Sequence, residues 1–104
     1  MMEVTHGTRG EVLIRIDGTF DAKEASRLAG WLAEVPAAGA LVLDFTAVRD
    51  CQDFGLAAVA SDLARRERLV VRGLTRHQER MLRYFGVELH PALDEPGLLE
   101  KSAR

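Results

Sequence analysis

The sequence predicts a small α/β domain with a mixed, mostly parallel sheet. Segments with strand and helix patterning alternate along the chain, which favours parallel strands joined by helices. The central run Ala40–Leu43 is apolar at every position, as expected of a strand buried on both faces. The length of 104 residues accommodates one hydrophobic core. We therefore expect four to five strands packed with three to four helices.

The first part of the chain is predicted to form a hairpin followed by a helix. Strands are expected at residues 2–6 and 11–17, and residues 18–19 are expected to turn the chain. Asp21 lies three residues before Glu24, which is the spacing of a capping box at a helix start. The apolar stripe of the predicted helix consists of Ala25, Leu28, Ala29 and Leu32.

The central segment is predicted to be a strand, a polar loop and a helix. The strand is expected to stop at Asp44, and residues 46–53 are expected to form the loop. The apolar residues of the helix recur at i, i+3, i+4 and i+7, and they are Leu56, Val59, Ala60 and Leu63. Open α/β sheets place their functional residues where strands end and helices begin. Functional residues are therefore sought at this junction.

The remaining elements are shorter. Residues 69–72 are predicted to form a strand, and a helix that ends at Gly86 follows. Thr75 and Gln78 have capping-box spacing at the start of that helix, whose apolar residues are Met81, Leu82 and Phe85. A last edge strand is expected at residues 87–89, and a weak helix at residues 95–103.

The composition predicts one soluble, cytoplasmic domain spanning residues 1–104. Its core is expected at about residues 11–89, with residues 90–104 as a C-terminal extension. No apolar run approaches the roughly 20 residues of a membrane span, and no signal-peptide core is present near the N-terminus. Cys51 is the single cysteine and permits no internal disulfide, which fits a reducing compartment. A net charge of −2 gives no general attraction to nucleic acid.

Three short motifs resemble, in order, those of a known family. Gly18–Asp21, with Ala25, is similar to a Gly-x-Leu-Asp turn before a first helix, and residues 41–46 resemble a Val-Leu-Asp-Leu-Ser strand end. Residues 52–56 fall where the family has Asp-Ser-Ser-Gly-Leu at a helix start. The chain thus resembles a STAS domain, the fold of bacterial anti-sigma-factor antagonists, over about residues 11–89.

The resemblance implies a non-catalytic regulatory module that binds a protein, such as a histidine-kinase-like anti-sigma factor. In such antagonists the partner phosphorylates the second serine of the Asp-Ser-Ser motif. Here that position is Phe54, preceded by Gln52 and Asp53. Phenylalanine has no oxygen to accept a phosphoryl group, so phosphorylation at this position is chemically excluded. The hydroxyls of Thr46, Ser26 and Ser61 remain open as other positions of modification.

The resemblance also places a partner-binding surface at this turn. Its candidate residues are Asp21, Asp44, Thr46, Asp53, Phe54 and Gly55. Asp53 is interpreted either as a helix cap or as a fixed charge that imitates the modified state. Phe54 either packs against the sheet or is exposed as an anchor for the partner. Asp44 either borders the surface or accepts backbone amides in the loop, and Asp21 either caps a helix or contacts the partner.

Enzyme, metal and cofactor functions find little support in the sequence. A phosphatase loop starting at Cys51 would need arginine at position 57, where the chain has Ala57. The histidines lack metal-ligand spacing, and they are His6, His77 and His90. No phosphate-binding or serine-hydrolase motif is present. We therefore expect no enzyme activity, no cofactor and no metal.

An arginine-rich segment leaves further interpretations open. Residues 65–83 contain seven arginines and two glutamates, and Arg76, Arg80 and Arg83 form one helical stripe. The stripe is either a solvated face with a Glu79–Arg83 pair, or a basic surface for an acidic protein or a nucleotide phosphate. Nucleic acid ranks third, because the stripe lacks aromatic residues for base stacking. An alternative function is an accessory subunit that binds the ATPase of an ABC transporter, and a monomer or weak dimer is expected.

Overall fold

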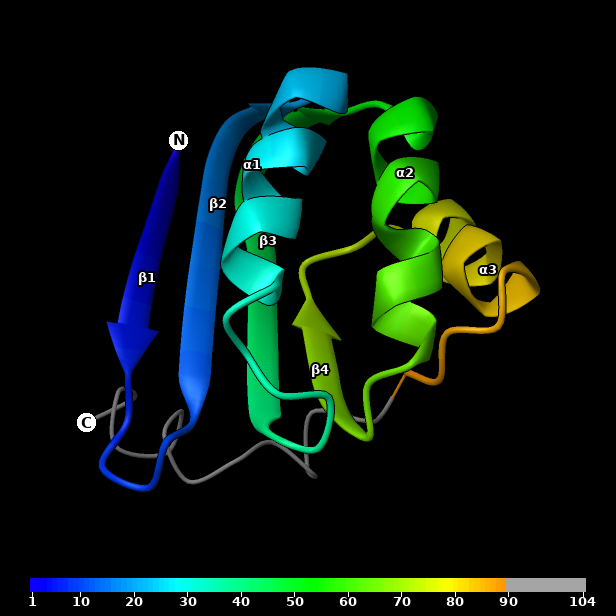
Figure 1. The fold of residues 1–104 in the computed structure, drawn as a ribbon. Helices are drawn as coiled ribbons and strands as arrows, with labels where there is room; N and C mark the ends of the chain where they lie inside the picture. The colour runs from blue at the N-terminus through cyan, green and yellow to red at the C-terminus, as the bar shows by residue number, and fades with distance from the viewer. Residues whose placement is uncertain (90–104) are drawn as a thin grey trace.

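The computed structural model describes residues 1–89, which form one four-stranded sheet in the order β1-β2-β3-β4. The strands are β1 (Met2–His6), β2 (Val12–Phe20), β3 (Ala40–Cys51) and β4 (Arg68–Arg72). The helices are α1 (Ala22–Leu32), α2 (Asp53–Ala64) and α3 (Arg76–Tyr84). β1 pairs antiparallel with β2, and the other neighbours pair in parallel. Helices α1 and α2 cover one face of the sheet, with α3 beside α2 (Figure 1). The predicted α/β class is confirmed.

The core follows the alternation of side chains along the strands. The main cluster lies between the sheet and its helices, and from β2 it receives Val12, Ile14 and Ile16. A second buried cluster consists of Leu13, Val42 and Val70, which belong to the opposite face because successive side chains of a strand alternate. The run at the start of β3 is thus buried on both faces, as predicted.

Both central strands are longer than predicted. Instead of a turn at residues 18–19 and a loop at 46–53, β2 continues to Phe20 and β3 to Cys51. The two strands pair with each other along this extension, whereas β4 ends opposite Asp44. Gly18 has a φ of 77° next to one of two register shifts in the pairing. The polar residues of this part of β3 are mostly exposed, so their polarity reflects solvent contact and not a loop.

The helix starts match the predictions, and one predicted strand is wrong. Asp21 accepts the backbone N–H of Glu24 at 2.9 Å, and Thr75 and Gln78 form a complete capping box. The predicted apolar residues of α1 and α2 are buried, except the exposed Ala29. Residues 87–89 are not a strand, because the Val87 N–H donates to the Leu82 carbonyl and closes the end of α3. The helix predicted at residues 95–103 lies outside the described residues.

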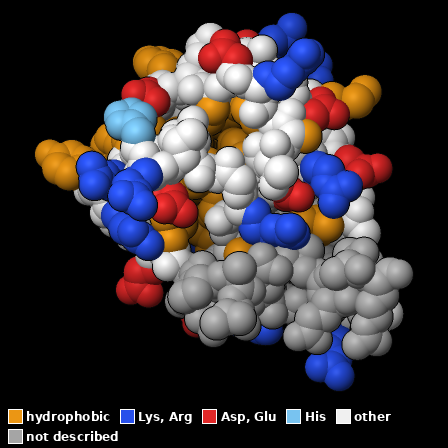
Figure 2. Space-filling view, turned by 180° about the vertical axis from the view of Figure 1, so that it is seen from behind, with side chains coloured by type: hydrophobic (Ala, Val, Ile, Leu, Met, Phe, Trp, Pro, Cys, Tyr) orange, Lys and Arg blue, Asp and Glu red, His pale blue; other side chains and the backbone are white. Residues whose placement is uncertain are grey.

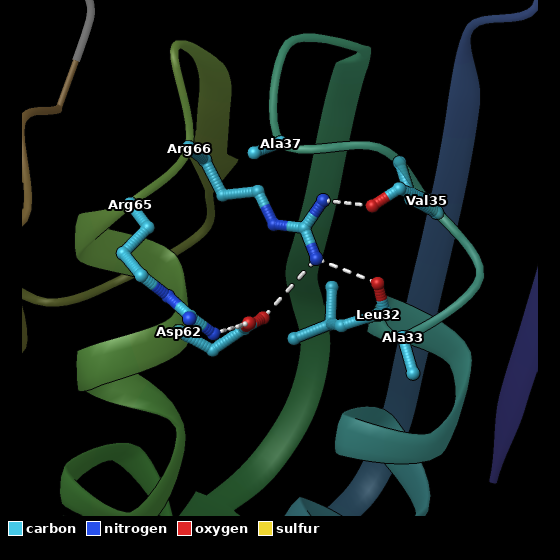
Figure 3. Close-up of a pocket in the computed structure, with 7 residues that line it drawn as sticks. All are labelled: Leu32, Ala33, Val35, Ala37, Asp62, Arg65 and Arg66. Carbon is cyan, nitrogen blue, oxygen red and sulfur yellow. Dashed lines mark hydrogen bonds and ion pairs between the residues drawn. The ribbon is translucent and has the colours of Figure 1, made fainter.

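Arg66, just after α2, joins this helix to the C-terminal end of α1. Its side chain is only 4% exposed and donates to the carbonyl oxygens of Leu32 and Val35 (Figure 3). It also donates to the Pro36 carbonyl. The Nη2 atom also lies 3.2 Å from Oδ2 of Asp62. The N–H of Val35 also donates to the Leu32 carbonyl, so Arg66 adds a second donor at the end of α1 and extends the contact to the chain that follows it. Helices α1 and α2 are therefore fixed relative to each other at this end.

Within residues 1–89, no helix is long and apolar enough to cross a membrane.

Candidate functional site

The first turn of α2 is held close to the junction between β2 and α1. The N–H of Gln52 donates to the Phe20 carbonyl at 3.0 Å, and Gln52 is the N-cap of α2. A Cβ atom added to the buried Gly55 would lie 3.1 Å from the carbonyl oxygens of Phe20 and Asp21. Only glycine therefore fits there without displacing its neighbours. This contact brings Asp21 to the same rim of the domain as the start of α2.

Phe54 points away from the sheet at this first turn. Gly55 and Leu56 are buried, and the Phe54 side chain is 72% exposed. Of the two interpretations of Phe54, the exposed one matches the structure. An exposed ring on a rigid helix turn has the property of an anchor that a partner can bury.

Asp53 does not cap α2. It is the first residue of the helix, after the N-cap Gln52, and Gln52 itself makes no side-chain cap hydrogen bond. The Asp53 carboxylate lies 3.0 Å from Nε2 of His77 in the first turn of α3. Both side chains are exposed, so this pair connects the two helix starts at the surface.

An open groove lies between α2 and α3. It has a volume of about 580 Å³ and is lined by Asp53, Phe54, Ala57, His77, Arg80, Met81, Tyr84 and Phe85. We call it the α2–α3 groove. Five large hydrophobic side chains are exposed in residues 1–89, and three of them line this groove: Phe54, Tyr84 and Phe85. Sequence analysis missed this groove, because it depends on how α3 packs beside α2. Its only sequence signal was Tyr84, an aromatic residue outside the apolar stripe of its helix.

One residue of the arginine stripe, Arg80, lines this groove, and the other two lie on the same helix. Arg76, Arg80 and Arg83 are all exposed. The described residues contain no Glu79–Arg83 ion pair, so that predicted pair is wrong. Viewed from behind, Lys and Arg side chains gather beside a histidine and hydrophobic side chains at the edge of the molecule where α3 lies (Figure 2). Basic and apolar groups thus share one surface.

Asp44 and Thr46 are separated from the start of α2. Asp44 precedes Gln52 by eight residues of extended chain, roughly 26 Å. Its side chain belongs to the sheet face opposite α1 and α2. It is 4% exposed, accepts the N–H of Thr46 at 2.9 Å and lies 3.4 Å from Nε of Arg15. The interpretation that Asp44 accepts a backbone amide matches this geometry. The structure therefore brings together Asp21, Asp53, Phe54 and Gly55, and leaves out the two residues of β3.

The electrostatics of Asp44 are those of a structural carboxylate. Burial alone would raise its pKa, but hydrogen bonds from Thr46 and the charges of Arg72 and Arg15 outweigh burial and lower the pKa below 3.8. Asp44 is therefore ionised at neutral pH.

Cys51 is not activated for chemistry. Burial, and then the charges of Asp53 and Asp50, raise the pKa of its thiol to about 11. The thiol is therefore protonated at neutral pH, whereas a nucleophilic cysteine needs the thiolate. Residues 1–89 contain no group of three His, Cys, Asp or Glu side chains placed to hold a metal ion.

The sequence model of the family described as "Mlab, STAS domain" matches residues 4–95. The chain belongs to the STAS domain family. No curated protein matches it significantly. Among solved structures, the anti-sigma-factor antagonist SpoIIAA in its unphosphorylated form matches with a TM-score of 0.67 and 14% identity over the full length of both chains. The crystal structure of Mglu matches with a TM-score of 0.52 and 17% identity, over 86% of this chain and 19% of that chain. At these identities the likeness concerns the fold.

Proposed function

We propose that this STAS domain is a non-catalytic regulatory module that binds a protein partner through the first turn of α2. The observation that carries the proposal is Phe54, whose ring is 72% exposed at the turn where the family resemblance places partner binding. Asp53 lies beside it, and Asp21 lies on the same rim. The partner class is a histidine-kinase-like anti-sigma factor or another cytoplasmic signalling protein. The fold shared with SpoIIAA supports this class of partner.

The proposed binding does not depend on phosphorylation at position 54. Phe54 offers no hydroxyl, so ATP-driven transfer to this residue has no acceptor. Asp53 carries one fixed negative charge, and its carboxylate lies 3.0 Å from Nε2 of the exposed His77. A phosphate carries about −1.5 to −2 at neutral pH, so Asp53 reproduces little of a modified state. The interaction is therefore set by the abundance of the partners and not by a kinase step at this turn.

The proposal is tested by titrating the domain with a histidine-kinase-like anti-sigma factor in a calorimeter. Replacing Phe54 by alanine should weaken binding by about tenfold or more, because exposed aromatic anchors are typical interface hot spots. Trp31→Ala is the matched control, since Trp31 is an exposed aromatic residue of α1 outside the α2–α3 groove. ATP should not change the affinity. Equal affinities for Phe54→Ala and the unaltered domain would contradict the docking surface.

A second candidate is a subunit that binds the ATPase of an ABC transporter. The aromatic residue at position 54 favours this candidate as well, because a surface without a phosphate acceptor suits a permanent contact. Here the domain should co-purify with an ABC-type ATPase in a fixed ratio, and Phe54→Ala should release it while Trp31→Ala should not. Binding to the anti-sigma factor alone would eliminate this candidate.

A further inference from the structure

We propose that the α2–α3 groove binds an acidic amphipathic helix of the partner protein. This inference rests on the proposed function and names the chemistry of the segment that the partner supplies. The proposal is based on a surface where exposed aromatic rings lie beside a row of arginines, Arg76, Arg80 and Arg83. The described ion pairs and hydrogen bonds include none that neutralises this row.

Exposed aromatic rings border the groove. Phe54 and Tyr84 are 72% and 87% exposed, from two different helices, and both border the groove together with Phe85. The rings of Tyr84 and Phe85 meet edge to face at 5.8 Å, so they hold each other in place. Grooves between two helices commonly bind the apolar face of a third helix through residues at i, i+3, i+4 and i+7.

The positive charges lie on α3, whose Arg80 lines the groove. Arg76, Arg80 and Arg83 are spaced at i, i+4 and i+7, so they extend along about 10 Å of one helix side. A helix lying alongside α3 presents its own residues at the same intervals, and Glu or Asp at those positions would meet the three guanidinium groups. Arginine suits this task because its fork of donors matches a carboxylate. Asp53 also lines the groove, but its single carboxylate stands against the three guanidinium groups of the arginine row.

The test uses two synthetic helical peptides of about 15 residues, or four turns. Both carry the same Leu and Phe stripe, which is flanked by Glu in one peptide and by Lys in the other. Fluorescence anisotropy gives the affinities, and backbone NMR shifts locate the binding. The Glu peptide should bind about tenfold tighter than the Lys peptide, with shifts in α2 and α3, because charge complementarity sets specificity at such surfaces. Equal affinities, or shifts elsewhere, would overturn the proposal.

Charge-reversal variants distinguish specific binding in the groove from nonspecific binding of the peptides. Arg80→Glu combined with Arg76→Glu should reverse the preference, so that the Lys peptide binds about tenfold tighter. Arg9→Glu combined with Arg49→Glu changes the net charge by the same amount at exposed positions outside the groove, and this control should leave the preference intact. Phe54→Ala should weaken both peptides. All of these side chains are exposed, so unchanged thermal unfolding confirms that each variant is folded.

The outcomes for this inference and for the proposed function are distinct. If Phe54→Ala weakens binding of the whole partner but the Glu and Lys peptides bind equally, the acidic helix is wrong and the docking surface stands. If ultracentrifugation shows a dimer that Arg80→Glu dissociates, the groove binds a second copy of this chain, and the proposed occupant is wrong.

Discussion

Two aspartates in the β3–α2 segment carry the same charge but have different roles. Asp44 is buried on the sheet, where Thr46 and Arg15 fix its carboxylate. Asp53 is exposed at the surface, where its one partner among residues 1–89 is a histidine that is itself exposed. A partner protein can reach Asp53 without disturbing the core. At the residue scale, surroundings and not residue type decide which carboxylate belongs to the candidate site.

We expect Asp44→Asn to lower the free energy of unfolding by about 1–2 kcal/mol at neutral pH, because a charged, buried hydrogen-bond acceptor is lost. The pKa of Asp44 is lowered by folding, so its contribution is present above pH 3.8 and disappears as the pH falls through the folded-state value. The difference between the unaltered domain and the variant should therefore shrink below pH 4. Urea unfolding at several pH values measures it, with Asp50→Asn as an exposed control. A constant difference down to the most acidic pH would contradict the assigned electrostatics.

We expect Cys51 to react slowly with iodoacetamide in the folded domain. With the pKa of the thiol raised from 9.0 to about 11, the thiolate fraction at pH 8 falls by about 100-fold relative to an ordinary thiol. Mass spectrometry should show that Cys51 is alkylated about 100-fold more slowly in the folded chain than in the chain unfolded in guanidinium. The folded rate should rise about tenfold for each pH unit below 11. Equal alkylation rates in the folded and unfolded chain would show that the Cys51 thiol is reactive in the folded domain.

The family motif placed Phe54 at a helix start and the capping pattern placed Asp21 at a helix cap, and both positions match the structure because these signals are local. The sequence could not decide whether Asp53 caps α2. A shift of one residue in the start of the helix moves the cap from Asp53 to Gln52. Sequence reasoning grouped Asp44 with the site because the strand was expected to end there. The pairing of β2 with β3 beyond β4 is a tertiary contact, and that pairing moves the site away from Asp44.

At the scale of elements, Arg66 is the main polar connection between α1 and α2. Three carbonyl oxygens at the end of α1 and after it accept its donors, and its side chain is almost fully buried. The neighbouring Arg65 pairs with the same Asp62 but is exposed. Two adjacent arginines therefore offer a matched comparison between a buried and an exposed cation.

We expect Arg66→Ala to destabilise the domain by about 2–4 kcal/mol, because it removes a buried charged side chain that donates to three carbonyl oxygens and leaves the Val35 carbonyl without its donor. Arg65→Ala should change the free energy of unfolding by about 0.5 kcal/mol or less, since exposed ion pairs contribute little. Urea unfolding followed by circular dichroism gives both values. Similar losses in the two variants would show that the buried hydrogen bonds of Arg66 contribute no more than a surface charge.

The elements themselves were largely predictable, and their ends were not. Apolar periodicity identified α2 because its buried residues repeat at helical spacing. Periodicity failed where strands run past the core, since exposed strand residues in the second half of β3 resemble loop residues in composition. It also failed at Val87, where one buried residue closes a helix and pairs with no strand. The connection through Arg66 carries no local pattern at all, because its acceptors lie about 30 residues away.

At the scale of the whole molecule, burial is unevenly distributed between the sheet and α3. The paired strands β2 and β3 supply much of the core, whereas Leu82 is the only fully buried residue of α3. The surface link from α3 to α2 is the exposed Asp53–His77 pair, which contributes little by itself. One wall of the α2–α3 groove is therefore the least anchored helix, which suits a site that adapts to a partner.

We expect hydrogen exchange to show that α3 is less stable than the central strands β2 and β3. The amides of α3 should exchange through a local opening with a lower free energy than the amides shared by β2 and β3, which should require global unfolding. Leu82→Ala should accelerate exchange throughout α3 more than in the central strands, because it removes the anchor of that helix alone. Occupation of the groove by the acidic peptide should slow α3 selectively, since the ligand binds only the closed arrangement. Exchange in α3 as slow as in β3 would mean that the groove is rigid, and that a partner meets a preformed surface.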